Sequence, residues 1–289
     1  MLPLTKALVT VVRFMPFSCI FFISRVLGIL ASWIPGSSRR IFRINKKHVM
    51  DPLGLKVKLS RVYASLIQGV FDFIKLSHSS DEAFRRAVKV QGEENMSLAL
   101  RANRGALAIT AHYSAWELIP RAVALCGHRV GVVSRKVGTD EVAGYVDGLR
   151  GMHGATVIDR GSGIARLMRT LRGNAAVGIL IDQDTMGAEG DFVDFLGLEA
   201  RTPVGPAQLA LRFGIPILTL HISRERSGRY LLTIDPPVDL DDYHGEDGHL
   251  GLTARLTGRI EEWIYEDPEQ WIWIHERWAR RPGRAPGLR

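Results

Sequence analysis

Cysteine is scarce in this chain, with only Cys19 and Cys126 among 289 residues. Neither a C-x-x-C pair nor a disulfide framework is present, so a disulfide-stapled fold and a thiolate metal site are not expected. The chain also lacks zinc-finger spacing, a basic region with heptads and an aromatic RNA-binding signature. Nucleic acid therefore comes last among the candidate partners. These absences favour a reduced, cytosol-facing protein.

The chain also lacks an uninterrupted apolar run long enough for a plain membrane span. The segment from Ala7 to Pro35 exceeds the roughly 20 residues that a span needs, but Arg13, Pro16 and Arg25 interrupt it. Each arginine would cost about 2.5 to 3.5 kcal/mol at the bilayer centre. We expect a tilted or partly immersed anchor whose arginines reach the headgroups, with a true span as the second alternative. A signal peptide is a further alternative, but no small-x-small cleavage site follows at the expected distance.

Acidic residues are outnumbered, and the net charge is +8. Such an excess calls for an acidic partner, either an anionic membrane surface or an acidic carrier protein once nucleic acid is set aside. Basic residues crowd the region after the Pro-Gly-Ser-Ser break at 35–38, which indicates the cytoplasmic side of a membrane and an affinity for anionic lipids. They are Arg39, Arg40, Arg43, Lys46, Lys47, Lys56, Lys58 and Arg61.

The most informative stretch is G-A-L-A-I-T-A-H-Y-S-A-W-E-L-I-P, residues 105–120. Its first half, residues 105–111, predicts a buried strand, and the residues after Glu117 predict a helix. His112 then lies at the carboxyl edge of a strand, where open α/β sheets place catalytic groups. On one continuous helix His112 and Glu117 would diverge by roughly 140°, so they converge only if His112 lies on the loop. A converged pair makes His112 a general base that Glu117 orients.

An alternative interpretation of the same residues is structural. Ser114 followed three residues later by Glu117 fits a capping box at a helix start, which explains the carboxylate without catalysis. Ser114 is not presented as a hydrolase nucleophile, because the G-x-S-x-G elbow is missing.

The H-Y-S-A-W-E block resembles the H-x4-D/E motif of the glycerolipid acyltransferase superfamily. Its surroundings resemble one branch, the bacterial lipid A lauroyl/myristoyl acyltransferases. The ordered series of matching blocks runs from about residue 100 to 283. After H-Y-S-A-W-E it comprises Ser134-Arg135-Lys136, G-I-L-I-D-Q-D at 178–184, F-V-D-F-L-G at 192–197, T-P-V-G-P-A-Q-L-A-L-R-F-G-I-P-I at 202–217 and P-E-Q-W-I-W-I-H-E-R-W at 268–278.

The resemblance implies a membrane-associated acyltransferase that moves a fatty acyl group from acyl carrier protein to a hydroxyl of a lipid A precursor. It implies His112 as base and Glu117 as its partner, no cofactor and no metal, and a catalytic domain on the cytoplasmic side of the inner membrane. Related branches acylate phosphoinositide mannosides or aminolipids, so the acceptor stays open. From other classes, a lipid hydrolase and a non-catalytic lipid-binding protein stay open as well.

Strands and helices alternate along the rest of the chain, which predicts an α/β fold with a central mixed sheet covered by helices and an N-terminal membrane-associated helix. We expect an anchor at 1–35, a basic helical region at 36–100, an acyltransferase domain at 101–283 and a tail at 284–289. Helices are predicted at 62–76, 81–90 with Asp81 as cap, 140–152, 162–171, 252–266 and 269–280, with another starting at Thr202-Pro203. Further strands are predicted at 129–134, 155–158, 175–181 and 230–234. The glycines and phenylalanines of 187–197 predict a mobile apolar loop, suited to covering an acyl chain or simply lying at the surface.

Charged residues follow several of these strands. Arg135 and Arg160 follow two strand ends and are candidates for a phosphate site, since a guanidinium can engage two oxygens. Asp182 and Asp184 end the next strand; a magnesium site is one interpretation, but we expect one aspartate to pair with a basic residue. Arg201, beside a predicted helix start, is the remaining candidate for substrate binding.

Overall fold

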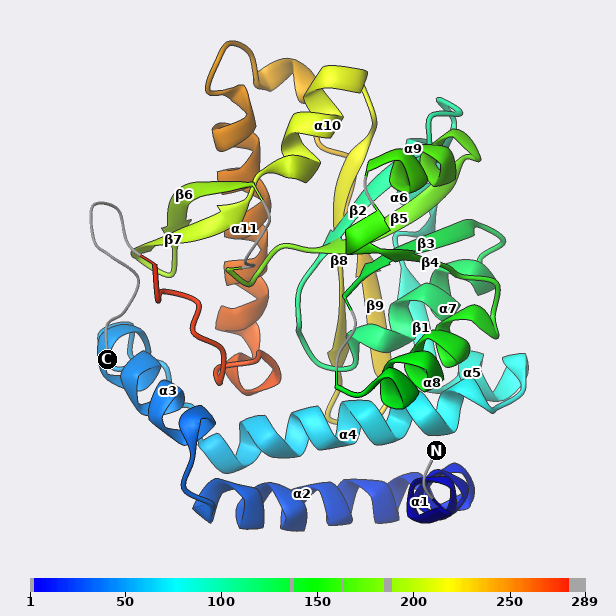
Figure 1. The fold of residues 1–289 in the computed structure, drawn as a ribbon, viewed down its shortest axis with the longest axis vertical. Helices are drawn as coiled ribbons and strands as arrows, with labels where there is room; N and C mark the ends of the chain where they lie inside the picture. The colour runs from blue at the N-terminus through cyan, green and yellow to red at the C-terminus, as the bar shows by residue number, and fades with distance from the viewer. Residues whose placement is uncertain (1–2, 136–137, 163, 185–188, 281–289) are drawn as a thin grey trace.

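A seven-stranded sheet forms the centre of the molecule (Figure 1). The computed structural model describes residues 3–135, 138–162, 164–184 and 189–280. The strands lie in the order β1-β9-β8-β2-β5-β3-β4, and β6 and β7 form a separate antiparallel pair. Their bounds are β1 (Val88–Gln91), β2 (Ala106–Thr110), β3 (Arg129–Ser134), β4 (Thr156–Asp159), β5 (Ala175–Leu180), β6 (Gly190–Phe195), β7 (Leu198–Pro203), β8 (Ile217–Arg224) and β9 (Tyr230–Ile234).

The central sheet is mixed because one pair of neighbours, β8 and β9, runs antiparallel. The other neighbours, including β2 with β5 and β2 with β8, run parallel. All five residues of β2 are buried, as expected for a strand covered on both faces.

Helices cover both faces of the sheet, and the alternation along β2 separates two apolar cores. Leu107 and Ile109 belong to the core that includes residues of α9, α10 and α11, whereas Ala106 and Ala108 face the core formed with α6, α7 and α8. This arrangement confirms the predicted α/β fold with a helix-covered mixed sheet. The helices are α1 (Pro3–Phe14), α2 (Phe17–Trp33), α3 (Ser37–Asn45), η1 (Lys46–Met50), α4 (Leu59–Ser77), α5 (Asp81–Ala87), α6 (Glu93–Leu100), η2 (Trp116–Leu118), α7 (Ile119–Leu125), α8 (Asp140–Gly151), η3 (Arg160–Ser162), α9 (Ile164–Arg172), α10 (Gly205–Phe213), η4 (Leu240–Asp242), α11 (Gly248–Glu266) and η5 (Pro268–Gln270).

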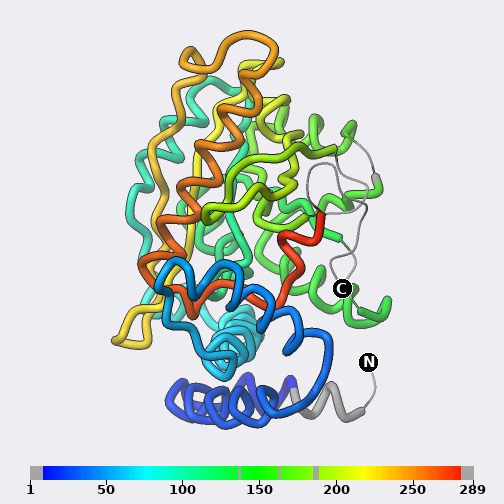
Figure 2. The backbone as a smooth tube through the Cα atoms, turned by 90° about the vertical axis from the view of Figure 1, so that its left-hand side faces the viewer, coloured from blue at the N-terminus to red at the C-terminus, as the bar shows by residue number. Residues whose placement is uncertain are grey.

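The N-terminal segment forms two helices, separated at Pro16, rather than one continuous anchor. α2 lies beside α4, at the edge of the molecule away from the sheet (Figure 1, Figure 2). The contact is close at Gly28, where a Cβ would lie 2.4 Å from the carbonyl oxygen of Ser60. Among the described residues of 3–280, no single helix is long and apolar enough to span a membrane. Taken together, α2 and the following α3–η1 segment reach that length and apolarity, but the two parts are bent by 90° relative to each other.

Two predicted helices are wrong in part or in whole. The helix predicted at 81–90 ends at Ala87, because the β-branched residues after it pair with β9, and its cap is the Ser80 hydroxyl, which accepts from the Ala83 N–H at 3.2 Å. The helix predicted at 269–280 is absent beyond the short η5. Side-chain hydrogen bonds replace a helical ladder in this segment; the Trp273 indole, for example, donates to the carbonyl oxygen of Pro268 at 2.7 Å.

The region of residues 190–205 also differs from its prediction. The expected apolar loop is the β6–β7 hairpin in its described part, whereas Gly187 lies outside the described residues. Thr202 and Pro203 end β7 instead of starting a helix, and α10 begins at Gly205. Pairing in register from Gly190↔Pro203 to Phe195↔Leu198 explains the strand conformation.

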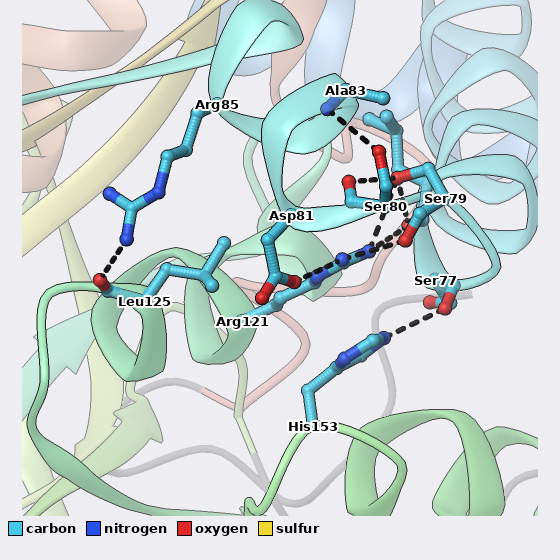
Figure 3. A network of polar contacts seen from close by, with 10 residues as sticks. Ser77, Ser79, Ser80, Asp81, Ala83, Arg85, Arg121, Leu125 and His153 are labelled. Atoms are coloured by element: carbon cyan, nitrogen blue, oxygen red, sulfur yellow. Dashed lines mark hydrogen bonds and ion pairs between the residues drawn. The ribbon is translucent and has the colours of Figure 1, made fainter.

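A buried arginine connects α7 to the end of α4 and the start of α5 (Figure 3). Arg121 is 5% exposed, and its guanidinium donates to backbone carbonyl oxygens of Leu76 and Ser79 and to the carboxylate of Asp81. The last carbonyl groups of a helix have no partner within the helix. Arg121 donates to two carbonyl groups at or just beyond the end of α4, and the Leu76 carbonyl oxygen also accepts from the backbone N–H and hydroxyl of Ser79. The network thereby fixes α4, which forms one wall of the cavity described below.

Candidate active site

His112 and Asp182 face each other at the carboxyl ends of neighbouring parallel strands. The register of β2 and β5 pairs Thr110 with Leu180, so the residues two positions beyond them lie level. The His112 Nδ1 lies 2.9 Å from Asp182 Oδ1, and the His112 backbone N–H donates to Asp182 Oδ2 at 3.0 Å. The strand register therefore brings together two residues that are 70 positions apart.

Asp182 is completely buried and remains ionised through its partners. The Trp271 indole N–H donates to Asp182 Oδ2 at 2.9 Å. Burial raises the pKa of the Asp182 carboxyl, but the charge and hydrogen bonds of His112 together with the indole outweigh burial, so the pKa lies below its usual value. Because Nδ1 is directed at the carboxylate, Nε2 is the ring nitrogen left to exchange a proton with a substrate.

Nε2 of His112 is the nitrogen available for chemistry. The side chain is 26% exposed, and within the described part of the chain Nε2 has no hydrogen-bond partner. The Trp116 ring packs edge-on against the imidazole, with ring centroids 5.1 Å apart. Together, Asp182 and Trp116 restrict the orientation of the imidazole.

Glu117 pairs with Arg150 of α8, whereas the partner of the imidazole is Asp182. Arg150 Nε lies 2.8 Å from Glu117 Oε2, and Arg150 Nη2 lies 2.5 Å from Glu117 Oε1. Burial lowers the pKa of Arg150, but Glu117 and Asp147 outweigh this effect and the pKa is raised. The orienting bond expected from Glu117 is thus supplied by another carboxylate, and the catalytic role of Glu117 stays a prediction. The capping box is not formed either, because η2 has no side-chain cap.

Asp184 is the second aspartate of the D-Q-D motif, and its carboxylate contacts two arginines. Arg280 donates to both of its oxygens at 2.5 Å, and Arg201 Nη1 lies 3.4 Å from Oδ1. The two aspartates therefore have separate partners, the imidazole for Asp182 and arginines for Asp184. Arg201, a predicted substrate-binding residue, is engaged in this structural ion pair.

Arg135 and Arg160 lie close together at the edge formed by β3 and β4. The register pairs Ser134 with Asp159, which directly precede the two arginines. The pKa of Arg160 is lowered, first by burial and then by the positive charge of Arg135. Two neighbouring cations suit an anion, which is the predicted use of this pair. Lys136 lies outside the described residues.

The C-terminal segment contributes buried groups that were not predicted as site residues. Besides Trp271 they include His275, whose pKa is lowered to about 4, first by burial. Arg277 is fully buried and donates to Thr202 Oγ1 at 2.5 Å, with its guanidinium over the ring of Phe195. The only signal for these residues in the sequence was the resemblance of the block at 268–278.

An apolar cavity opens beside the loop that carries His112. Its volume is about 260 Å³, and its walls come from α4, α8 and residues 114–117 of the site loop. Phe73, Ile74, Val146 and Leu149 are among its apolar lining residues, together with Trp116. Such a cavity suits a hydrocarbon chain.

The described residues bring together no group of three or more His, Cys, Asp or Glu side chains placed to hold a metal ion. Both carboxylates of the D-Q-D motif already have the nitrogen partners described above.

A family model supplies the context for this geometry. The model described as bacterial lipid A biosynthesis acyltransferase matches residues 3–280. The chain belongs to this family. The match includes the His112 loop, the D-Q-D strand end and the tryptophan-rich segment that the fold brings together.

Members of the lipid A acyltransferase family are also among the similar curated proteins. The lipid A biosynthesis palmitoleoyltransferase of Escherichia coli and the lipid A biosynthesis acyltransferase of Shigella flexneri are each 25% identical over 204 residues, which cover 70% of this chain. The chain spans 65% of the length of these two relatives. A phosphatidylinositol mannoside acyltransferase of Mycobacterium tuberculosis is 30% identical over 113 residues, 39% of this chain and 34% of that protein.

In this member of the lipid A acyltransferase family, the arrangement of the site allows two chemical functions. An imidazole with one nitrogen held by a buried carboxylate can accept a proton from a hydroxyl at the other nitrogen. The neighbouring apolar cavity can exclude water from an acyl chain. The site therefore contains a general base beside a place for hydrocarbon.

Proposed function

We propose that this protein is a membrane-associated O-acyltransferase that moves a fatty acyl group from acyl carrier protein to a hydroxyl of a lipid A precursor or a related glycolipid. The single observation that carries the proposal is the 2.9 Å contact between His112 Nδ1 and the buried carboxylate of Asp182, with Nε2 left for the acceptor. Family membership supports a lipid as the acceptor.

In the proposed reaction, His112 Nε2 takes the proton of the acceptor hydroxyl while that oxygen bonds to the thioester carbonyl carbon. The tetrahedral intermediate carries its negative charge on the former carbonyl oxygen. When it collapses, the carbon–sulfur bond breaks and the imidazolium returns the proton to the departing thiolate. Asp182 stabilises the imidazolium because its negative charge lies next to Nδ1.

We assign Glu117 a role through Arg150 rather than through direct contact with the base. Their side chains are only 20% and 15% exposed, so the ion pair is poorly screened and holds the site loop against α8. Glu117 also lines the apolar cavity. The pair thus fixes the loop that follows His112 in the sequence and that forms part of the cavity wall.

Arg135 and Arg160 are the candidates for binding a phosphate, either on the lipid acceptor or on the prosthetic arm of the carrier. Their proximity supports this role because a phosphate would relieve the repulsion between two guanidinium groups. Asp184 with Arg201 and Arg280 contributes to the shape of the site rather than to substrate charge.

Membrane association is supported by the exposed face of α2. Phe22 and Trp33 are 68% and 70% exposed although they are large and apolar, and Ile29 and Leu30 are about half exposed. Single exposed apolar residues are ordinary, but this many on one helix indicate a lipid or protein contact. The net charge of +8 favours an anionic bilayer and an acidic carrier protein.

The test is a product analysis with the full chain in detergent micelles. Acyl carrier protein charged with a fatty acid is incubated with a lipid A precursor, or separately with a phosphatidylinositol mannoside, since the mycobacterial relative makes that acceptor the second candidate. We expect one added acyl mass on the lipid A precursor, which disappears in His112→Ala. Release of free fatty acid without an acceptor would instead identify a hydrolase, and product formation by His112→Ala at the parent rate would rule out the assigned base.

A further inference from the structure

A second, larger cleft lies between α2, α4 and the β8–β9 hairpin. Its volume is about 870 Å³, and it shares only Ser114 with the lining of the apolar cavity. Its walls are strongly basic. The six arginines that line it are Arg25, Arg61, Arg86, Arg224, Arg226 and Arg229.

Two of these arginines surround one aromatic ring. The guanidinium carbon of Arg224 lies 4.8 Å from the centroid of Phe21, and that of Arg25 lies 5.2 Å from the same centroid. Within the described part of the chain neither guanidinium forms an ion pair, and Arg224 Nε is buried without a hydrogen-bond partner. Two cations held at one ring repel each other unless an anion lies nearby.

Three carboxylates line the cleft beside its six arginines, and each has a partner within the cleft. Glu269 pairs with Arg61 at 3.7 Å, Glu225 accepts from the Ser227 hydroxyl, and Asp267 accepts from Gln270. Behind the cleft, Asp72 accepts from the Tyr230 hydroxyl at 2.6 Å. Burial raises the pKa of its carboxyl, although this hydrogen bond and the charge of Arg224 oppose the rise. With six arginines and three carboxylates in its lining, the cleft keeps an excess of positive charge.

The cleft also borders the apolar face of the molecule. Phe17 and Phe21 of α2 line it and are themselves 42% and 38% exposed. The same helix carries the more strongly exposed Phe22 and Trp33. A ligand that combines a negative headgroup with hydrocarbon matches both surfaces at once.

We propose that this cleft binds the phosphate of an acidic phospholipid, with Arg25 and Arg224 as its principal contacts. The headgroup lies among the arginines and its chains run along α2. This inference rests on the membrane association in the proposed function. It adds a lipid site that is separate from the reaction centre and that fixes the orientation of the enzyme on the bilayer.

The test measures binding of the full-length protein to vesicles of phosphatidylcholine alone or mixed with phosphatidylglycerol. The double variant Arg25→Gln/Arg224→Gln removes the two principal contacts, and Arg226→Gln/Arg229→Gln removes two exposed charges of the same cleft without touching Phe21. The matched control is Arg166→Gln/Arg169→Gln on α9, which lies far from α2 (Figure 1) and loses the same charge. Circular dichroism and thermal unfolding show whether each variant is folded.

We expect the Arg25/Arg224 variant to bind the phosphatidylglycerol vesicles about tenfold more weakly or worse, given the contribution of each arginine near an anionic surface. The Arg226/Arg229 variant should weaken binding several-fold, and the α9 control less than twofold. Micelle acyltransferase activity should stay at the parent level in all three. Equal losses in all variants would show a diffuse charge effect and overturn the specific site.

Two further outcomes separate this inference from the proposed function. A parent chain that binds neither vesicle would refute membrane association itself. Unchanged vesicle binding combined with a raised KM for the acylated carrier in the Arg25/Arg224 variant would assign the cleft to the carrier's phosphate and overturn the lipid assignment. Competition by free glycerol phosphate, without any dependence on vesicles, would likewise show a soluble phosphate site.

Discussion

The imidazole of His112 lies 2.9 Å from a carboxylate oxygen of Asp182, which follows the neighbouring parallel strand β5 by two residues and is 70 positions away in the sequence. This contact, rather than one within the H-Y-S-A-W-E block, fixes the orientation of the proposed base. Because Asp182 is fully buried, loss of its charge cannot be compensated by solvent.

The Glu117–Arg150 pair should show strong energetic coupling. Glu117→Gln and Arg150→Met each leave one partly buried group without its partner, so each should lower the free energy of unfolding by about 2 to 4 kcal/mol. The double variant should lose less than the sum, with a coupling energy of about 1 to 3 kcal/mol. Denaturant unfolding of the four proteins measures this, and additive losses would mean that the ion pair is not formed.

The apolar cavity should determine which acyl chain is used. Val146 lines it and is partly buried, so Val146→Trp should fill space that a long chain needs. Each methylene that loses its site costs about 0.8 kcal/mol. We expect kcat/KM for a hexadecanoyl donor to fall about tenfold or more relative to an octanoyl donor. An unchanged ratio would place the chain elsewhere.

Acid should destabilise the protein through His221. This imidazole stacks on Trp263 with centroids 4.5 Å apart, and burial lowers its pKa from 6.5 to about 4. Between pH 6.5 and pH 4 the His221 imidazole is protonated more in the unfolded chain than in the folded chain. The free energy of unfolding therefore falls as the pH falls from 6.5 towards 4. In His221→Phe this contribution is absent. The stability difference between parent and variant should shift by about 2 kcal/mol between about pH 7 and pH 5, measured by urea unfolding; a constant difference would contradict the lowered pKa.

The network of Figure 3 should matter for stability more than for chemistry. Arg121→Met removes the buried guanidinium that donates to the carbonyl oxygens of Leu76 and Ser79 and to the Asp81 carboxylate, and should lower the free energy of unfolding by about 2 to 4 kcal/mol. Arg85→Met, in which an exposed arginine loses one bond to the Leu125 carbonyl oxygen, is the matched control and should cost less than about 1 kcal/mol. Equal losses in thermal unfolding would mean that the buried network is dispensable.

Much of the fold could be predicted because local patterns carry it. The strands at 129–134 and 230–234 have the predicted bounds, and β2, β5 and α4 differ by a few residues. The patterns failed where tertiary pairing decides the conformation. Val88 and Val90 continue a helical apolar pattern, yet they pair with β9, and the segment after Gln270 is held by buried indole and guanidinium groups instead of a helix.

The candidate site could be predicted only in part. The sequence places His112 at a strand end, and the resemblance indicates the D-Q-D block, but neither states which carboxylate faces the imidazole. That depends on β2 and β5 being neighbours in register, a long-range relationship that spacing within one block does not contain. No sequence pattern identified Arg150 as a site residue, because an arginine on a helix is ordinarily a solvated surface group.

The most direct test is the kcat of Asp182→Asn, measured at saturating donor and lipid acceptor with the folded state checked by circular dichroism. The amide keeps the shape of the carboxylate but cannot stabilise the imidazolium or hold the same tautomer. We predict a fall in kcat of about 10²- to 10⁴-fold, the contribution of a positioned general base, whereas Trp271→Phe, which removes one hydrogen bond to Asp182, should lower kcat only several-fold. A kcat for Asp182→Asn within threefold or so of the parent value would contradict the assignment of the His112–Asp182 pair as the catalytic base.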